Sequence, residues 1–182
     1  PVKHNMPGLP DAKNLENYYQ SAKVWKFELD DAGNIKDEYF QRRIKVYNEK
    51  TAYRHKYTKK ELLENGANKI PEYSVYYDKD GNPHKYDYLN SRYFYCKFYE
   101  TLVKDNEDLE YLKQKIKKGY NLNIVGYDGY KPEGSYMDMY KDTSKPFGHE
   151  MVLYVLLTED DPSKYPWNQY YNDNKKIYEG VI

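Results

Sequence analysis

Two carboxylates and a histidine are the side chains of this 182-residue chain that are best suited to acid–base chemistry. Glu16 follows a turn-rich lead-in, and Asp128 lies in the glycine-flanked segment Gly126–Tyr130. His149 directly follows Gly148. A pair of acids can stabilise the positive charge that develops on a sugar when its bond to a base breaks, and a histidine can carry the proton. We therefore take these three residues as candidate catalytic groups.

Other polar and aromatic residues could hold a ligand. Lys23 and Arg54 could bind phosphate oxygens, because cationic donors make strong charge-assisted hydrogen bonds with them. Arg54 and His55 belong to the basic and aromatic pentad Tyr53–Tyr57, predicted to be a loop that grips a phosphate or diphosphate, with a solvated loop as the alternative. The candidate ligand-binding residues are Tyr19, Gln20, Lys23, Arg54, His55, Tyr130 and Gly148.

Ordinary structural roles explain the same residues. A solvated helix face accounts for the spacing of Glu16, Gln20 and Lys23. Asp128 fits a residue that caps a turn, and His149 fits a helix-start residue bonded to backbone. The sequence leaves both interpretations open at each position.

The longest strongly apolar segment, Lys145–Leu157, should organise the core. Its apolar residues recur at the spacing of a helix face, and Pro146 can open a helix. A buried strand is the alternative, since the run is also rich in β-formers. A helix start at Gly148 and His149 would aim backbone N–H groups at an anion or polar ligand, and Glu150 fits a first-turn acid favoured by the helix dipole.

Periodic patterns predict further helices. The first is expected to run from Leu15 to about Phe27, with Asp11 or Asn14 as its N-cap. In the second, the inward residues are predicted to be Tyr39, Phe40, Ile44 and Tyr47. The second helix is predicted at Asp37–Tyr47. The other predicted helices are Lys59–Asn65, Ser91–Val103, Leu109–Ile116 and Ser135–Tyr140.

Strands are fewer. Tyr73–Tyr77 and His84–Tyr88 flank a turn-rich hexapeptide and predict a β-hairpin, an exposed insertion at about 70–90. Asn121–Tyr127 is a β-branched run that leads into a glycine-rich loop, and such loops often carry function. The predicted fold is α+β: a single domain over residues 1–182, mostly helical around a small sheet with a β-hairpin insertion.

Composition limits the classes of function. Lys and Arg together number 29, as do Asp and Glu, so bulk charge favours neither nucleic acid nor an anionic membrane as the partner. The single cysteine, Cys96, excludes an internal disulfide and fits a reducing compartment, which predicts a cytoplasmic location. Neither an 18-residue apolar run nor a signal-peptide core is present, so no membrane partner is expected.

Tyrosine is the unusual residue, with 25 copies against 5 Phe and 2 Trp. Biased composition explains this count, and a stacking surface for bases is the alternative. The sequence contains no P-loop and none of the patterns GxGxxG, HExxH or GxSxG. Its four histidines lack metal-ligand spacing, so neither a metal nor another cofactor is predicted.

Three segments in a fixed order resemble the NADAR superfamily, the YbiA-like N-glycosidases. Leu15–Lys23 resembles the Glu-His-x-Tyr-Gln-x-x-Lys helix of that family, Gly126–Tyr130 its Asp-centred loop, and Phe147–Leu153 its Leu-Gly-x-x-Leu-Met helix start. The matching residues are Glu16, Tyr19, Gln20, Lys23, Asp128, Tyr130, Phe147 and Gly148.

The resemblance implies a mainly helical α+β hydrolase that cleaves N-glycosidic bonds of ADP-ribosyl or related ribosyl compounds without a metal. Its partner would be a nucleotide-like small molecule or an ADP-ribosylated substrate. The chain is also similar to small proteins of phages and large DNA viruses, which would place it in the host cytoplasm.

Two other classes of function remain open, and the sequence does not fix the oligomeric state. One is a non-enzymatic viral interaction or nucleic-acid-binding protein that uses tyrosine stacking and a local basic patch. The cations of that patch are Arg42, Arg43, Arg54, His55 and Lys56. The other is a structural virion component that self-associates.

Overall fold

The computed structural model describes residues 3–53, 59–64 and 70–181. Helices predominate in these ranges, and a small antiparallel sheet has three strands, so the predicted α+β class is confirmed. The chain divides into two compact units, the first formed by Pro1–Ser91 and Tyr178–Ile182 and the second by Arg92–Ile177. Among the described residues, no helix has the length and hydropathy needed to cross a membrane.

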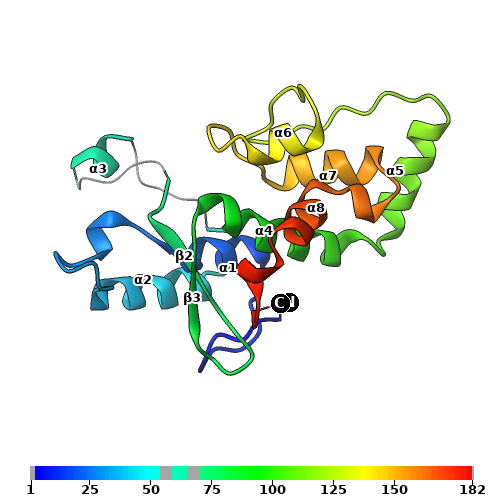
Figure 1. Cartoon of the computed structure of the whole chain (residues 1–182). Coiled ribbons are helices and arrows are strands. Elements are labelled where there is room, and N and C mark those ends of the chain that lie inside the picture. The colour runs from blue at the N-terminus through cyan, green and yellow to red at the C-terminus, as the bar shows by residue number, and fades with distance from the viewer. Residues whose placement is uncertain (1–2, 54–58, 65–69, 182) are drawn as a thin grey trace. The chain divides into compact units, whose positions relative to one another are not determined.

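The sheet of the first unit consists of β1 (Lys23–Val24), β2 (Tyr73–Tyr77) and β3 (Pro83–Tyr86) in that order. Figure 1 shows β2 and β3 side by side. The hairpin of β2 and β3 confirms the prediction, with Val75 opposite Lys85. Its predicted exposure is wrong, because β2 pairs on both sides and buries its three central residues. The hairpin is therefore part of the core of this unit.

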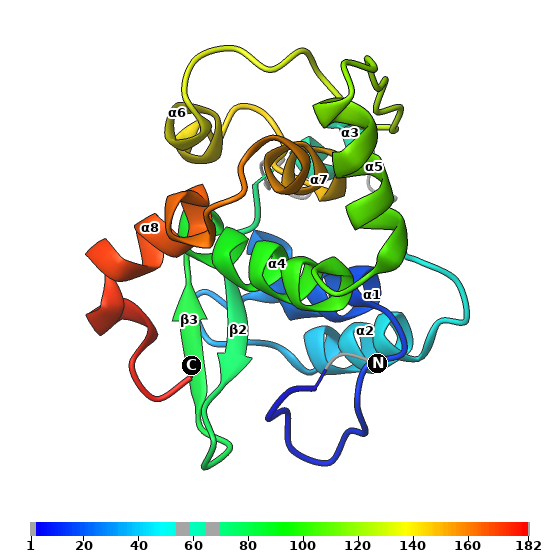
Figure 2. The same cartoon turned by 90° about the vertical axis from the view of Figure 1, so that its right-hand side faces the viewer.

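Helices α1 (Leu15–Ala22) and α2 (Asp37–Asn48) pack against each other (Figure 2). Asn14 caps α1, since its Oδ1 accepts a hydrogen bond from the backbone N–H of Asn17 at 2.8 Å. The predicted extension of this helix to Phe27 is wrong. It ends at Ala22 because the next two residues pair with β2 as β1, and the 3-10 helix Lys26–Glu28 follows.

The inner face of α2 differs from the predicted one. Tyr39 and Tyr47 are buried as expected, but Phe40 and Ile44 are 44% and 51% exposed. Arg43 lies inside instead and is 3% exposed. Its Nη1 donates to the hydroxyls of Tyr39, at 2.9 Å, and Tyr77, at 3.1 Å. A buried guanidinium thus supplies a donor to two ring hydroxyls, and the Tyr39 hydroxyl also donates to the carbonyl of Ala22 at 3.5 Å.

Short α3 (Lys59–Glu64) matches the helix predicted for that stretch. The second unit is built from the later turns of α4 and from four further helices. Their bounds are α4 (Tyr88–Val103), α5 (Glu107–Lys117), α6 (Tyr136–Lys141), α7 (His149–Thr158) and α8 (Pro166–Asp173). Figure 2 shows α5 beside α7, and α6 contacts α8. Two 3-10 helices, Pro162–Lys164 and Lys175–Tyr178, flank α8.

The apolar run forms α7, which confirms the helix over the alternative strand. Val152 and Val155 are fully buried, as a central helix requires. The helix begins at His149 with Gly148 as its N-cap, so Pro146 lies outside it and the prediction for Pro146 is wrong.

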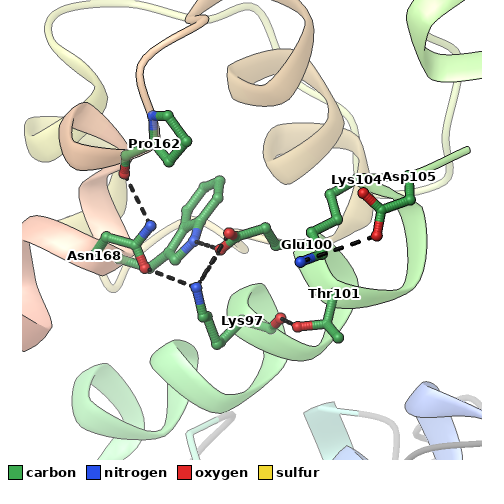
Figure 3. A network of polar contacts seen from close by, with 8 residues as sticks. Lys97, Glu100, Thr101, Lys104, Asp105, Pro162 and Asn168 are labelled. Atoms are coloured by element: carbon green, nitrogen blue, oxygen red, sulfur yellow. Dashed lines mark hydrogen bonds and ion pairs between the residues drawn. The ribbon is translucent and has the colours of Figure 1, made fainter.

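Trp167 anchors the C-terminal segment. It is fully buried, and its Nε1 donates to Oε2 of Glu100 at 2.8 Å. Lys97 Nζ lies 3.0 Å from the same oxygen, so this buried carboxylate is paired with a charge and a hydrogen-bond donor (Figure 3).

The predicted strand Asn121–Tyr127 is wrong. This segment is irregular, and Val125 and Tyr127 are 85% and 82% exposed. The three strands of the described sheet all belong to the first unit. Without a neighbouring strand, β-branched residues have no ladder to join, and their propensity alone does not make a strand.

His4 fixes the segment before α1. Its Nδ1 accepts a hydrogen bond from the backbone N–H of Met6 at 3.0 Å, and its Nε2 donates to the carbonyl of Pro10 at 2.9 Å. The ring stacks on Tyr18 with 5.0 Å between centroids. Because a backbone N–H can only donate, the imidazole must be neutral. Burial lowers the pKa of His4 from its ordinary value.

Acid should therefore weaken the first unit through His4. Since the folded pKa is lower than the unfolded one, the unfolded chain binds more protons. The contribution of His4 is complete above about pH 6.5 and is lost as the pH falls through the folded pKa. Measuring the free energy of unfolding against pH for the wild type and His4→Asn should give a difference that shrinks on acidification. A constant difference between about pH 5 and about pH 8 would contradict this account.

Candidate functional site

The candidate residues fall into two groups, one in each unit. The α1 group, in the first unit, consists of Glu16, Tyr19, Gln20 and Lys23. The Glu150 centre, in the second, consists of Glu150, His149, Gly148, Tyr99 and the segment Gly126–Gly129, which carries Asp128. Each group is described by itself, and their convergence on one ligand stays a prediction.

Side chains of the α1 group contact one another in pairs. Gln20 Nε2 donates to Oε1 of Glu16 at 2.6 Å, as expected for residues one turn apart. Lys23 lies on β1 rather than on the helix, and its Nζ is 4.5 Å from the ring centroid of Tyr19. The Oε1 of Gln20 is buried and accepts no hydrogen bond from the described residues.

Asn17, beside Glu16, has a structural role. It is 1% exposed, and its Nδ2 donates to the carbonyls of Glu49, at 2.9 Å, and Thr51, at 3.1 Å. Its Oδ1 accepts from the backbone N–H of Tyr53 at 2.5 Å. Asn17 therefore fixes the chain that follows α2. The candidates Arg54 and His55 come next and lie outside the described residues.

Glu150 is a buried carboxylate in the first turn of α7. The residue is 5% exposed, and its Oε1 lies 3.2 Å from Nε2 of His149, whose side chain is 52% exposed. This contact lacks hydrogen-bond geometry, and within the described part of the chain Oε1 accepts no hydrogen bond. The N-terminal end of a helix favours a negative charge, which offsets part of the cost of burial.

His149 also contacts an aromatic ring. It stacks on Tyr99 with 6.4 Å between centroids and 28° between planes. Burial raises the pKa of Tyr99, and the nearby charge of Glu150 adds to that effect. Tyr99 therefore stays protonated at neutral pH and can donate a hydrogen bond.

Two glycines make room for the Glu150 carboxylate. A Cβ at Gly126 would lie 1.9 Å from Oε1 and 2.2 Å from Cγ of Glu150. A Cβ at Gly148 would lie 3.3 Å from Oε2. Only a residue without a side chain allows the backbone at position 126 to approach Glu150 this closely. The segment Gly126–Gly129 therefore packs directly on the carboxylate.

Two further candidate residues lie in or directly after the segment Gly126–Gly129. Asp128 is exposed, within the segment that packs on Glu150. Tyr130 has Lys145 Nζ 5.2 Å from its ring centroid, a cation–π contact. The structure thus brings Gly148, His149 and the segment carrying Asp128 to Glu150.

Arg92, on α4, positions the chain that leads into α7. It is 2% exposed, and its Nη1 donates to the carbonyls of Tyr140, at 2.5 Å, and Asp142, at 3.1 Å. Its Nη2 donates to the carbonyl of Lys145 at 2.6 Å. The guanidinium thereby binds the C-terminal end of α6, where the helix dipole favours a cation, and fixes the turn before Gly148.

Glu150 is the residue that sequence reasoning missed. Its position in a first turn explained it as a dipole-favoured acid, although it lies inside the apolar segment that is expected to organise the core. The available signals were the glycines at 126 and 148, but glycine is common in loops, and only the fold shows that both adjoin one carboxylate. Within the described residues, no cluster of three or more His, Cys, Asp or Glu could hold a metal ion.

Comparison with protein-family models, curated proteins and solved structures finds no match to this chain. The resemblance to the NADAR superfamily therefore stays a prediction. The site must be argued from its own geometry.

The contact of Gly126 with Glu150 can be tested by a double-mutant cycle. Gly126→Ala should lower the free energy of unfolding by about 1–3 kcal/mol, because the added methyl group overlaps a buried side chain. In the Glu150→Ala background the same substitution should cost less than about 0.5 kcal/mol, because the overlapping atoms are gone. Urea denaturation of the four proteins measures both values.

Gly129→Ala is the matched control in the same segment. A Cβ there would meet its nearest atom, the carbonyl oxygen of Gly126, at an ordinary contact distance of 3.5 Å. This variant should not lower the free energy of unfolding in either background, and it should raise that free energy by at most about 1 kcal/mol, equally in both, because alanine restricts the unfolded chain. An equal cost of Gly126→Ala with and without Glu150 would show that the contact does not set the requirement for glycine.

Proposed function

We propose that this protein is a hydrolase that cleaves the N-glycosidic bond of an ADP-ribosyl or related nucleotide-derived ribosyl compound. The observation that supports it most is the buried Glu150 carboxylate, 3.2 Å from the half-exposed imidazole of His149. A buried hydrogen-bond acceptor beside an imidazole, which can both accept and donate a proton, is the pairing that acid–base hydrolysis needs.

In the proposed reaction, the bond between the anomeric carbon and the base nitrogen breaks while a bond to a water oxygen forms. The positive charge that builds on the sugar is stabilised by the Glu150 carboxylate. Protonated His149 gives its proton to the departing nitrogen, and the exposed carboxylate of Asp128 accepts the proton of the attacking water. Protons and charges therefore balance without a metal or a redox cofactor.

The α1 group has a substrate-binding role in this proposal. Lys23 would neutralise a phosphate, and Glu16, together with Gln20, would orient the ribosyl portion. The family resemblance implies the residues, and their pairwise contacts support the roles. Glu16, a catalytic candidate in the sequence, is assigned in this proposal to ligand binding. Cys96 has no part in the reaction, because it is fully buried and burial raises the pKa of its thiol.

We also propose that the protein acts in the cytoplasm, or in the host cytoplasm if it is viral. The free thiol of Cys96 fits a reducing compartment. The small-molecule partner of the proposed hydrolase would be a nucleotide-derived ribosyl compound.

The nucleic-acid-binding alternative has less support from the described residues. Arg42 pairs with Glu28, and its Nη2 also donates to the carbonyl of Lys23 at 2.5 Å. Arg43 is buried against tyrosine hydroxyls. Both arginines therefore make internal contacts that a phosphate backbone would have to replace.

Turnover is tested by incubating the protein with NAD, ADP-ribose and ADP-ribosylated nucleic acid, followed by mass analysis of the products. We expect release of a free base or ribosyl product. Glu150→Gln, Asp128→Asn and Glu16→Gln should each lower the rate by about 10²-fold or more, since each removes a group placed at the reacting bond or its ligand.

Glu133→Gln is the control, because it changes an exposed acid close to the same segment. It should leave the rate unchanged. Undiminished turnover in all three site variants would remove these residues from the mechanism. If no product forms, and nucleic acid instead binds with an affinity that falls steeply with salt, the binding alternative holds.

A further inference from the structure

The segment that packs on Glu150 is weakly held. Asn121–Gly126 makes no backbone hydrogen bond to the described residues, and Val125 is 85% exposed. Segments with few buried contacts and unbonded backbone open at low free-energy cost. The close approach of Gly126 to the Glu150 carboxylate is a contact that this part of the chain would lose on opening.

Glu100 shows what a structural carboxylate looks like in the same unit. It is 7% exposed, and its Oε2 accepts hydrogen bonds from Trp167 Nε1 and Lys97 Nζ (Figure 3). Glu150 is as deeply buried, yet its Oε1 accepts no hydrogen bond from the described residues. A buried acceptor without donors costs free energy, and a ligand that supplies the donors is one reason to keep such a group.

We propose that Gly126–Gly129 is a cover that lifts from Glu150, and that the uncovered carboxylate binds the two adjacent hydroxyls of a ribosyl group. This inference rests on the proposed function and names the residue that recognises the sugar. Each carboxylate oxygen adjoins a glycine, so no side chain at those two positions crowds an approaching hydroxyl. Two oxygens can accept two O–H donors, as a vicinal diol presents.

Hydroxyls suit this carboxylate better than a ligand cation does. His149 Nε2 lies 3.2 Å from Oε1, so before it gives its proton to the leaving group a protonated His149 would repel a cation bound as ligand, whereas the charge on the sugar builds only as that proton leaves. Neutral donors complete the missing hydrogen bonds of Oε1 without that repulsion.

Opening of the cover can be measured by labelling carboxyl groups of the native full-length chain with a water-soluble carbodiimide and an amine, followed by peptide mapping. Glu150 should be labelled at least about ten-fold faster than Glu100, because it needs only local opening. Equal labelling rates for these two carboxyl groups would show that Glu150 is exposed no more easily than Glu100, and would contradict the proposed opening of Gly126–Gly129.

Two glycine variants should shift the labelling in opposite directions. Gly129→Ala lowers the entropy of the open segment and fits the closed one, so it should slow the labelling of Glu150 several-fold. Gly126→Ala blocks closure and should accelerate it. The rate at Glu100 should stay the same in both variants. A labelling rate at Glu150 that is unchanged in both variants would also contradict the proposed opening of the cover.

Ligand recognition is tested with a matched pair, adenosine diphosphate and 2′,3′-dideoxyadenosine diphosphate, each at millimolar concentration. The first should protect Glu150 from labelling several-fold, while the second, which lacks the diol, should not. Protection by both, or by neither, would overturn recognition of the diol. Protection without turnover of any ribosyl substrate would support the inference while contradicting the proposed hydrolase, so the two failures are distinguishable.

Discussion

A buried carboxylate pressed against a glycine backbone is the contact on which the candidate site depends. Because Gly126 has no side chain, the segment around it can lie on Glu150, and because Arg92 fixes the turn before Gly148, α7 begins where it presents that acid. The charge is held by the first turn of a helix and by His149 rather than by a hydrogen bond to Oε1. Burial without full pairing is what separates this acid from one that only stabilises the fold.

Elsewhere in the described residues, several buried polar groups have well-defined partners. Arg43 donates to two tyrosine hydroxyls inside the first unit, and Glu100 accepts from Trp167 inside the second. A chain with 25 tyrosines must find partners for many hydroxyls, and buried cations and backbone carbonyls are among those it uses. Within the part of the chain that the structure describes, other buried atoms, such as Oε1 of Gln20 and Oγ of Ser74, also lack a hydrogen-bond partner, so the incomplete bonding of Glu150 supports a function only together with its contacts to His149 and to the glycine backbone.

Local patterns predicted the helices well, because the periodicity of segments such as Leu109–Ile116 and the apolar run of α7 needs only neighbouring residues. The failures depend on distant ones. The first helix stops early because two residues pair with β2, and Asn121–Tyr127 stays irregular because no strand lies beside it. The burial of Glu150 depends on a glycine far earlier in the chain, which no local pattern encodes.

The central claim is that Glu150 is kept for a ligand and not for stability. The most direct test compares the free energy of unfolding of Glu150→Gln with that of Glu100→Gln. We predict a loss of about 2 kcal/mol or more for Glu100→Gln, whose charge-assisted hydrogen bonds are removed, and less than about 0.5 kcal/mol for Glu150→Gln. An equally large loss at Glu150 would contradict the account, because it would show that the carboxylate is needed by the fold itself.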